Sequence, residues 1–267
     1  MVSTFVASDP DGYERYMGRW SRRVAPLFVE WAGINRGQRV LDLGCGTGSL
    51  TQALVQAQAS AVTGLDASAP YLDFARARIT DPTVSFELGD AYVLPYEDET
   101  FDRTLSMLTL DLLDDPERAL AEMRRVTRRG GTVAGLVNDF RCGFTAFSIV
   151  LDAAAPLEPT AAALRDEFMS DPKGWPDGLA ALFRAAGLDD VREGRLSVLF
   201  DFESFADYWS TFTSGQGRVG RWLMGLTQSR RSLIEHHVRP AYLCGSADGA
   251  RAFSTSFWVA RGMAPWR

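Results

Sequence analysis

Strand-like and helix-like segments alternate along the chain from Arg39 to Asn138, and this alternation limits the possible folds more than any other feature. Right-handed strand–helix–strand crossovers of this kind build an open parallel sheet with helices on both faces. The expected strands are RVLDLG, AVTGLD, TVSFELGD, TFDRTLSML and TVAGLVN. The expected helices cover Ser49–Gln58, Ser68–Ile79 and Asp115–Arg128, the last ended by Gly130 and Gly131.

The flanking segments extend this unit on both sides. Apolar residues at three- and four-residue steps predict a helix over residues 11–31. After Asn138 we expect helices over residues 140–171, a helix at GLAALFRAAGL, two helices over 203–238, and strands at GRLSVLFDF and ARAFSTSFWVAR. The prediction is one α/β, Rossmann-like, doubly wound domain with a mostly parallel seven-stranded sheet. It has an N-terminal helical arm (1–36), a ligand-binding core (37–138) and a second half with helical insertions (139–267).

Charge and cysteine content limit the partners and the compartment. A formal net charge of -6 on 267 residues disfavours nucleic acid as a partner. The three cysteines are far apart in sequence, which argues against a disulfide framework and against a zinc site. Because the sequence has no signal-like or membrane-length apolar run, we expect a cytoplasmic protein. We also expect no bound metal, and a monomer or homodimer.

The stretch LGCGTG after the first strand predicts a ligand-binding turn. Gly44, Gly46 and Gly48 are spaced G-x-G-x-G, whereas the dinucleotide fingerprint is G-x-G-x-x-G. Asp42 precedes the turn, and a carboxylate there repels a pyrophosphate but suits the ammonium group of an amino acid. The turn therefore favours a cationic ligand over a phosphate.

Two further acidic residues end the next strands. Asp66 ends the second strand, where a carboxylate can bind both ribose hydroxyls. Asp90 ends the third strand and is placed to bind the exocyclic amine of an adenine, with a backbone N–H of Ala91 directed to the ring. Together, Asp42, Asp66 and Asp90 predict a site for an adenosyl amino acid such as S-adenosylmethionine.

The blocks VLDLGCGTG, GLDAS, GDAYVLPYEDETFD and EMRRVTRRGGTVAG resemble the class I S-adenosylmethionine-dependent methyltransferases, especially the small-molecule branch with quinone-biosynthesis enzymes. The resemblance implies methyl transfer to a small acceptor, with S-adenosylhomocysteine as product. It places Asp42, Gly44 and Gly46 along the methionine part, with Leu108 and Thr109 facing the methionine chain, and it includes Cys45 among the cofactor-binding residues. Ala67, Asp90 and Ala91 fall at the adenine, and Asp66 at the ribose.

The segment YERYMGRWSRR resembles the arm that closes over the cofactor in some members of this family. By that likeness Tyr13, Met17 and Trp20 face the cofactor and Arg19 meets its carboxylate. One departure is that about fifty residues separate the last two strands, which related chains join tightly.

The sequence does not identify a catalytic base, in contrast to the residues predicted to bind the cofactor. His236 and His237 are the only histidines and therefore the ordinary candidates near neutral pH. Other functions stay open: a non-catalytic binding protein with this fold, or a methyltransferase acting on proteins. A nicotinamide oxidoreductase is disfavoured by Asp42 and by the glycine spacing.

Overall fold

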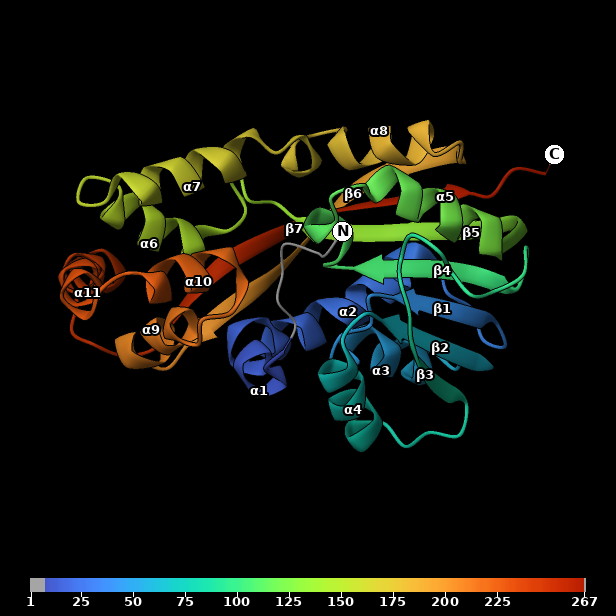
Figure 1. Ribbon diagram of the computed structural model, residues 1–267, viewed down its shortest axis with the longest axis horizontal. Coiled ribbons are helices and arrows are strands. Elements are labelled where there is room, and N and C mark those ends of the chain that lie inside the picture. The colour runs from blue at the N-terminus through green and yellow to red at the C-terminus, as the bar shows by residue number, and fades with distance from the viewer. Residues whose placement is uncertain (1–7, 267) are drawn as a thin grey trace.

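The computed structural model describes residues 8–266, which form a seven-stranded sheet in the order β3-β2-β1-β4-β5-β7-β6 (Figure 1). The first five strands are parallel, while β7 runs antiparallel to both β5 and β6. This confirms the predicted mostly parallel, doubly wound sheet. The strands are β1 (Arg39–Leu43), β2 (Ala61–Asp66), β3 (Val84–Leu88), β4 (Phe101–Met107), β5 (Thr127–Asn138), β6 (Asp189–Phe202) and β7 (Arg251–Met263).

Helices cover both faces of the sheet, because successive side chains of each buried strand point to opposite sides. Val40 of β1 packs into one apolar cluster together with Leu54, and its neighbour Leu41 packs into a second cluster together with Leu120. The helices on the first face are α2 (Arg19–Ala32), α3 (Ser49–Gln56) and α4 (Ala69–Arg78); those on the second are α5 (Pro116–Val126) and α8 (Gly178–Ala185).

The expected helix over Asp115–Arg128 ends earlier than predicted. Helix α5 stops at Val126, and Gly130 and Gly131 lie inside β5 instead of ending the helix. A Cβ on Gly131 would come within 2.7 Å of the Asp102 carbonyl oxygen, so the close approach of β4 explains the glycine there. These two glycines are therefore part of strand β5 and do not end helix α5.

The last two strands extend beyond the rest of the sheet. The end of β5 pairs with Phe257, whereas β6 and β7 continue as a two-stranded ribbon as far as the Phe202–Arg251 pair. Around that ribbon lies a helical lobe at one end of the molecule (Figure 1). Its helices are α6 (Thr145–Ala154), α7 (Pro159–Ser170), α9 (Phe205–Thr213), α10 (Gly217–Gly225) and α11 (Gln228–Leu243).

The segment between β6 and β7 was expected to form two helices, and the structure shows three. Gly215, at φ 74°, separates α9 from α10, and Thr227 caps α11 by accepting a hydrogen bond from the Arg230 N–H. A turn at Gly215 and a helix cap at Thr227 therefore divide the segment into three helices. The insertion therefore builds most of a lobe instead of a simple crossover.

The N-terminal arm is helical but not uniform. It consists of α1 (Pro10–Tyr13), a π-helical turn η1 (Glu14–Gly18) and then α2. Residues 1–7 of the predicted arm lie outside the described residues. Single π-helical turns are rare and occur often at functional sites, so η1 draws attention to the residues it carries.

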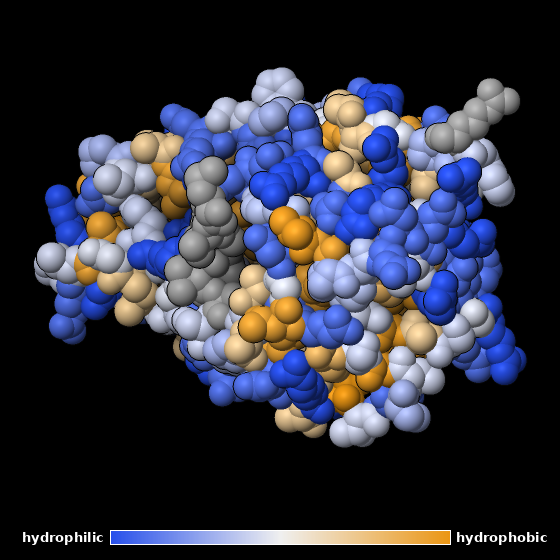
Figure 2. All heavy atoms as spheres, turned by 45° about the vertical axis from the view of Figure 1, so that its right-hand side comes forward, coloured by the Kyte–Doolittle hydropathy of each residue, from blue (hydrophilic) through white to orange (hydrophobic). Residues whose placement is uncertain are grey.

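The outer surface is mainly hydrophilic on the face shown in Figure 2, where apolar side chains reach the surface in separate groups. Scattered groups of this kind are ordinary for a solvated protein surface. Among residues 8–266, no helix has the length and apolar character that a membrane span requires.

Candidate functional site

The glycine turn follows β1 and leads into α3. The N–H groups of Gly44 and Cys45 both donate to the Leu65 carbonyl, at 2.8 and 3.1 Å. Gly46 has φ 54°, and a Cβ placed on it would first meet Tyr71, at 3.8 Å. The backbone of Gly46 is thus held in a glycine-favouring conformation with room for a ligand to approach closely.

Asp42 lies beneath this turn and is completely buried. Its Oδ2 accepts a hydrogen bond from the Thr51 hydroxyl at 2.6 Å, while Oδ1 has no hydrogen-bond partner within the described residues. Burial, helped by the nearby Asp66 carboxylate and opposed by the hydrogen bond from Thr51, raises the pKa of Asp42 to about 7. A cationic or hydrogen-bond-donating ligand at the turn would relieve this cost.

Asp66, at the end of β2, joins two strand–helix turns. Its Oδ2 accepts from the Gly46 N–H and its Oδ1 from the Ser68 N–H, each at 2.8 Å. Burial raises the pKa of Asp66, and the hydrogen bonds from backbone N–H groups oppose that rise. The structure therefore brings Asp66 against the glycine turn, with Ala67 exposed directly after it.

The other predicted ligand residues lie at the same edge of the sheet. Thr109 follows β4 and its hydroxyl donates to the Gly44 carbonyl at 3.2 Å, with Leu108 before it. Asp90 follows β3, is exposed, and accepts from the Tyr92 N–H at 2.9 Å, while Ala91 is half-buried. Cys45 is different, because its thiol packs toward Gly64 and its N–H is bonded to Leu65.

The arm lies over this edge. The ring of Tyr13 is 5.4 Å from the ring of Tyr71, and burial raises the Tyr13 pKa to about 12. Glu14 accepts a hydrogen bond from the Thr47 hydroxyl at 2.6 Å and lies 3.7 Å from the Arg78 guanidinium. The π-helical turn is therefore attached to the glycine turn.

Two of the predicted arm residues, Arg19 and Trp20, have partners in the second half of the chain. The Arg19 guanidinium pairs with Asp207 of α9 at 3.0 Å, and the Trp20 indole stacks on Phe200 of β6 with ring centroids 4.2 Å apart. Trp20 is completely buried, and its Nε1 donates to Asp201 at 3.2 Å. Both side chains thus attach the arm to the second half of the chain and do not cover the glycine turn.

The two histidines lie apart from the other predicted site residues. His236 and His237 lie exposed on α11, whose contacts are with α6 and α9 in the helical lobe. His237 Nδ1 lies 2.9 Å from the Leu233 carbonyl, one turn earlier in the same helix. Helix α11 lies in the helical lobe at one end of the molecule (Figure 1), so the structure does not bring the two histidines together with the glycine turn.

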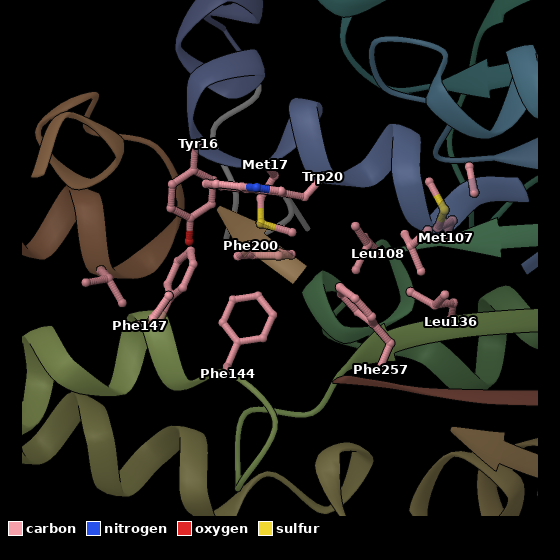
Figure 3. Close-up of a cluster of buried hydrophobic side chains, with 14 of the residues drawn as sticks. Tyr16, Met17, Trp20, Met107, Leu108, Leu136, Phe144, Phe147, Phe200 and Phe257 are labelled. Atoms are coloured by element: carbon pink, nitrogen blue, oxygen red, sulfur yellow. The ribbon is translucent and has the colours of Figure 1, made fainter. Parts of the chain in front are cut away.

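A narrow cavity of about 60 Å³ adjoins the edge of the sheet where Leu108 lies. The arm contributes one wall, and the chain after β4, the end of β5 and the helical lobe contribute the others (Figure 3). Its lining includes Tyr13, Tyr16, Met17, Leu108, Asp111, Asn138, Phe140, Phe144 and Phe168. Aromatic and apolar side chains with a few polar groups are the usual lining of a small-molecule site.

Sequence reasoning missed the polar residues of this cavity, of which Asp111 is one, together with Asn138, Asp171 and Arg218. Asp111 lies in η2 (Leu110–Leu112), and its Oδ2 accepts from Nδ2 of Asn138 at 2.7 Å and from the Asn138 N–H at 3.3 Å. Burial raises the Asp111 pKa, and the hydrogen bonds from Asn138 and the charge of Lys173 oppose that rise. The one sequence signal was its position two residues after Thr109.

Comparison with known proteins agrees with this geometry. The methyltransferase domain family matches residues 41–135. A demethylmenaquinone methyltransferase of Renibacterium salmoninarum is 39% identical over 113 residues, 42% of this chain and 45% of that protein. A phosphatidylethanolamine N-methyltransferase of Cereibacter sphaeroides is 38% identical over 129 residues, 47% of this chain and 62% of that protein. Residues 41–135 therefore form a methyltransferase domain, and these likenesses support the class I S-adenosylmethionine-dependent methyltransferases as the family of the chain.

The fold likeness extends further than the sequence likeness. The structure of a phosphoethanolamine N-methyltransferase of Haemonchus contortus, solved with phosphomonomethylethanolamine and S-adenosylhomocysteine, superposes with a TM-score of 0.59 at 16% identity. The superposition covers 98% of this chain and 58% of the Haemonchus contortus chain. The chain spans 45% of the length of the demethylmenaquinone methyltransferase and 62% of the length of the phosphatidylethanolamine N-methyltransferase. The names of these two relatives give different acceptors.

The residues at the glycine turn fit the cofactor of this family. Asp42 Oδ1 is a buried acceptor without a partner in the described part of the chain, and Gly46 leaves its backbone approachable. Asp66 is a carboxylate on the same turn. An ammonium group and ribose hydroxyls are the donors that such acceptors require.

Proposed function

We propose that this protein transfers a methyl group from S-adenosylmethionine to a small-molecule acceptor by in-line displacement. The observation that carries the proposal is the pairing of a buried, half-satisfied Asp42 with Asp66 at one glycine turn. When bound, S-adenosylmethionine supplies a methyl group on a positively charged sulfur, which needs no further activation.

The chain's own residues then have three tasks. Asp42, with Gly44 and Gly46, holds the methionine part; Asp66 holds the ribose; and Asp90, with Ala67 and Ala91, contacts the adenine. Leu108 and Thr109 line the methionine chain, and Tyr13 and Met17 of the arm cover it and exclude water. Holding the acceptor in line and dry can lower the barrier by several kcal/mol.

A small acceptor is supported by the cavity beside Leu108. Side chains of the arm form one wall of this cavity, and its volume of about 60 Å³ is well below the ~300–1,000 Å³ of ordinary small-molecule sites, so the arm must shift before an acceptor can enter. An arm that covers the glycine turn must move for ligands to enter. A methyltransferase for proteins would instead need an open groove at this position.

Thermal unfolding with different ligands tests the proposal. S-Adenosylhomocysteine and S-adenosylmethionine at 100-fold their dissociation constant should stabilise the fold by about 2.7 kcal/mol, and NAD should not. Stabilisation by NAD alone would contradict the proposal. Binding of both adenosyl ligands, without methyl transfer to any acceptor in a broad screen, would favour a non-catalytic binding protein.

A further inference from the structure

Two residues that line the cavity beside Leu108 carry buried acceptor oxygens. Asp111 Oδ1 and Asn138 Oδ1 are both buried, and neither has a hydrogen-bond partner in residues 8–266. The orientation of the Asn138 amide is settled, since its Nδ2 donates to Asp111 Oδ2 at 2.7 Å and a flipped amide would oppose two oxygens. Buried acceptors of this kind are costly until a donor reaches them.

The charged neighbours of Asp111 are largely engaged with other partners. Lys173, the single lysine of the chain, pairs with Asp171 at 3.1 Å. Arg218, on the α10 side, pairs with Glu167 and stacks over Phe168 with its guanidinium 4.6 Å from the ring centre. Tyr13 and Tyr16 face the cavity from the arm. Asp111 is thus a carboxylate without an ion-pair partner among the described residues.

The rest of the wall is mainly apolar and aromatic, with Asp171 and Arg218 as its other charged residues. In this wall Tyr16 and Met17 of the arm face Phe144, and Leu108 lies between the arm and the sheet (Figure 3). The Tyr16 and Phe147 rings pack edge to face, with centroids 5.3 Å apart. An occupant must therefore combine an apolar body with a polar end that donates hydrogen bonds.

We propose that Asp111 and Asn138 bind the acceptor through an O–H or N–H group, and that Asp111 Oδ1 takes its proton during methyl transfer. The inference rests on the proposed function and names the acceptor class: a hydroxyl or amine on an aromatic or otherwise apolar body. The acceptor oxygen or nitrogen forms the bond to the methyl carbon, and the bond from sulfur to that carbon breaks with its electron pair left on sulfur. The proton moves to the Asp111 carboxylate and then to water.

Aprotic acceptors fit the cavity poorly. A thioether or a tertiary amine brings no donor to either oxygen, and a carboxylate would be repelled by Asp111. A hydroxyl or amine hydrogen satisfies Asp111 Oδ1, and a second donor on the same molecule can reach Asn138 Oδ1. A carboxylate partly shielded from water is also a better proton acceptor than an exposed one.

Paired probes and an isosteric variant test this inference. With saturating S-adenosylhomocysteine present, saturation-transfer NMR compares catechol with its dimethyl ether, and aniline with N,N-dimethylaniline. Wild-type protein should bind at least one protic member at least about fivefold more tightly than its methylated counterpart. Asp111→Asn keeps the shape but turns the free acceptor into a donor, so it should abolish that preference.

The matched control is Asp114→Asn, which removes the same charge from an exposed residue three positions later. It should keep the wild-type preference. Absence of any protic preference in wild type, including absence of probe binding, overturns the inference, as does a preference that survives in Asp111→Asn. Calorimetric titration of S-adenosylhomocysteine into all three proteins separates this outcome from failure of the proposed function, because Asp111 is not a cofactor ligand in the proposal.

Discussion

Glu14 of the arm accepts a hydrogen bond from the hydroxyl of Thr47 in the glycine turn, with 2.6 Å between the two oxygens. The two residues are 33 positions apart and belong to segments that sequence patterns treat separately. Glu14 also lies 3.7 Å from Arg78, which donates to the Thr47 carbonyl at 3.4 Å. One carboxylate therefore holds the arm over the edge where the cofactor is proposed to bind.

Removing this contact should loosen the arm. Glu14→Ala is expected to speed dissociation of S-adenosylhomocysteine about fivefold, since a hydrogen bond to a largely buried carboxylate is worth about 1 kcal/mol or more. Stopped-flow tryptophan fluorescence measures the rate. Glu30→Ala, an exposed acid on α2, is the control and should dissociate at the wild-type rate. Equal rates for Glu14→Ala and wild type would show that the arm does not retain the ligand.

Asp42 should make the ligand-free protein less stable as pH rises. Its pKa of about 7 in the fold lies above the unfolded value near 3.9, so the folded state binds the proton more tightly. The free energy of unfolding, relative to Asp42→Asn, should be unaffected below about pH 4, fall between about pH 4 and pH 7, and stay lower above pH 7 by about 3–4 kcal/mol.

Urea denaturation of wild type and Asp42→Asn across this range measures the difference. The amide can still accept the hydrogen bond from Thr51, so the variant should be the more stable protein at high pH. It should also bind S-adenosylhomocysteine at least about tenfold more weakly, because a charge-assisted hydrogen bond is lost. Parallel pH profiles for the two proteins would contradict the burial argument.

Asp66 should confer a preference for ribose hydroxyls. Wild-type protein is expected to bind adenosine about tenfold more tightly than 2′-deoxyadenosine, by the usual worth of a hydrogen bond to a charged group. Asp66→Asn should reduce that ratio to near one. Asp73→Asn on the exposed side of α4 is the matched control. A ratio unchanged in Asp66→Asn would assign the ribose to another residue.

Trp20 should contribute to stability and not to ligand affinity. It stacks on Phe200 and donates to Asp201, so Trp20→Phe is expected to lower the free energy of unfolding by about 1–3 kcal/mol. Affinity for S-adenosylhomocysteine should stay within about twofold, a change of about 0.4 kcal/mol. A large loss of affinity at unchanged stability would restore the role first predicted for Trp20 at the cofactor.

The parts of the fold that sequence patterns predict are those with local causes. The apolar run of β1 and the glycines after it identify a strand and its turn, because the turn needs positive φ angles at Gly44 and Gly46, which glycine adopts most readily. Asp42, Asp66 and Asp90 each follow from their place on a strand, since parallel strands end at one edge. The three-helix insertion was misjudged because Gly215 and Thr227 act through short turns within a generally helical pattern.

The parts that could not be predicted depend on partners distant in sequence. Arg19 meets Asp207, 188 residues away, and no local pattern indicates that pairing. Asp111 reaches Asn138 only after β4 and β5 are side by side, so its burial is a tertiary effect. His236 and His237 had the right chemistry for a base, but the path of α11 leaves them exposed in the lobe.

Calorimetric titration of S-adenosylhomocysteine into wild type and Asp42→Ala tests the central proposal most directly. The account predicts a single site in wild type and a loss of at least about tenfold in affinity in the variant, with no heat from NAD in either protein. Equal affinity in wild type and Asp42→Ala, or binding of NAD in place of S-adenosylhomocysteine, would contradict the assignment of the glycine turn to a cationic adenosyl ligand.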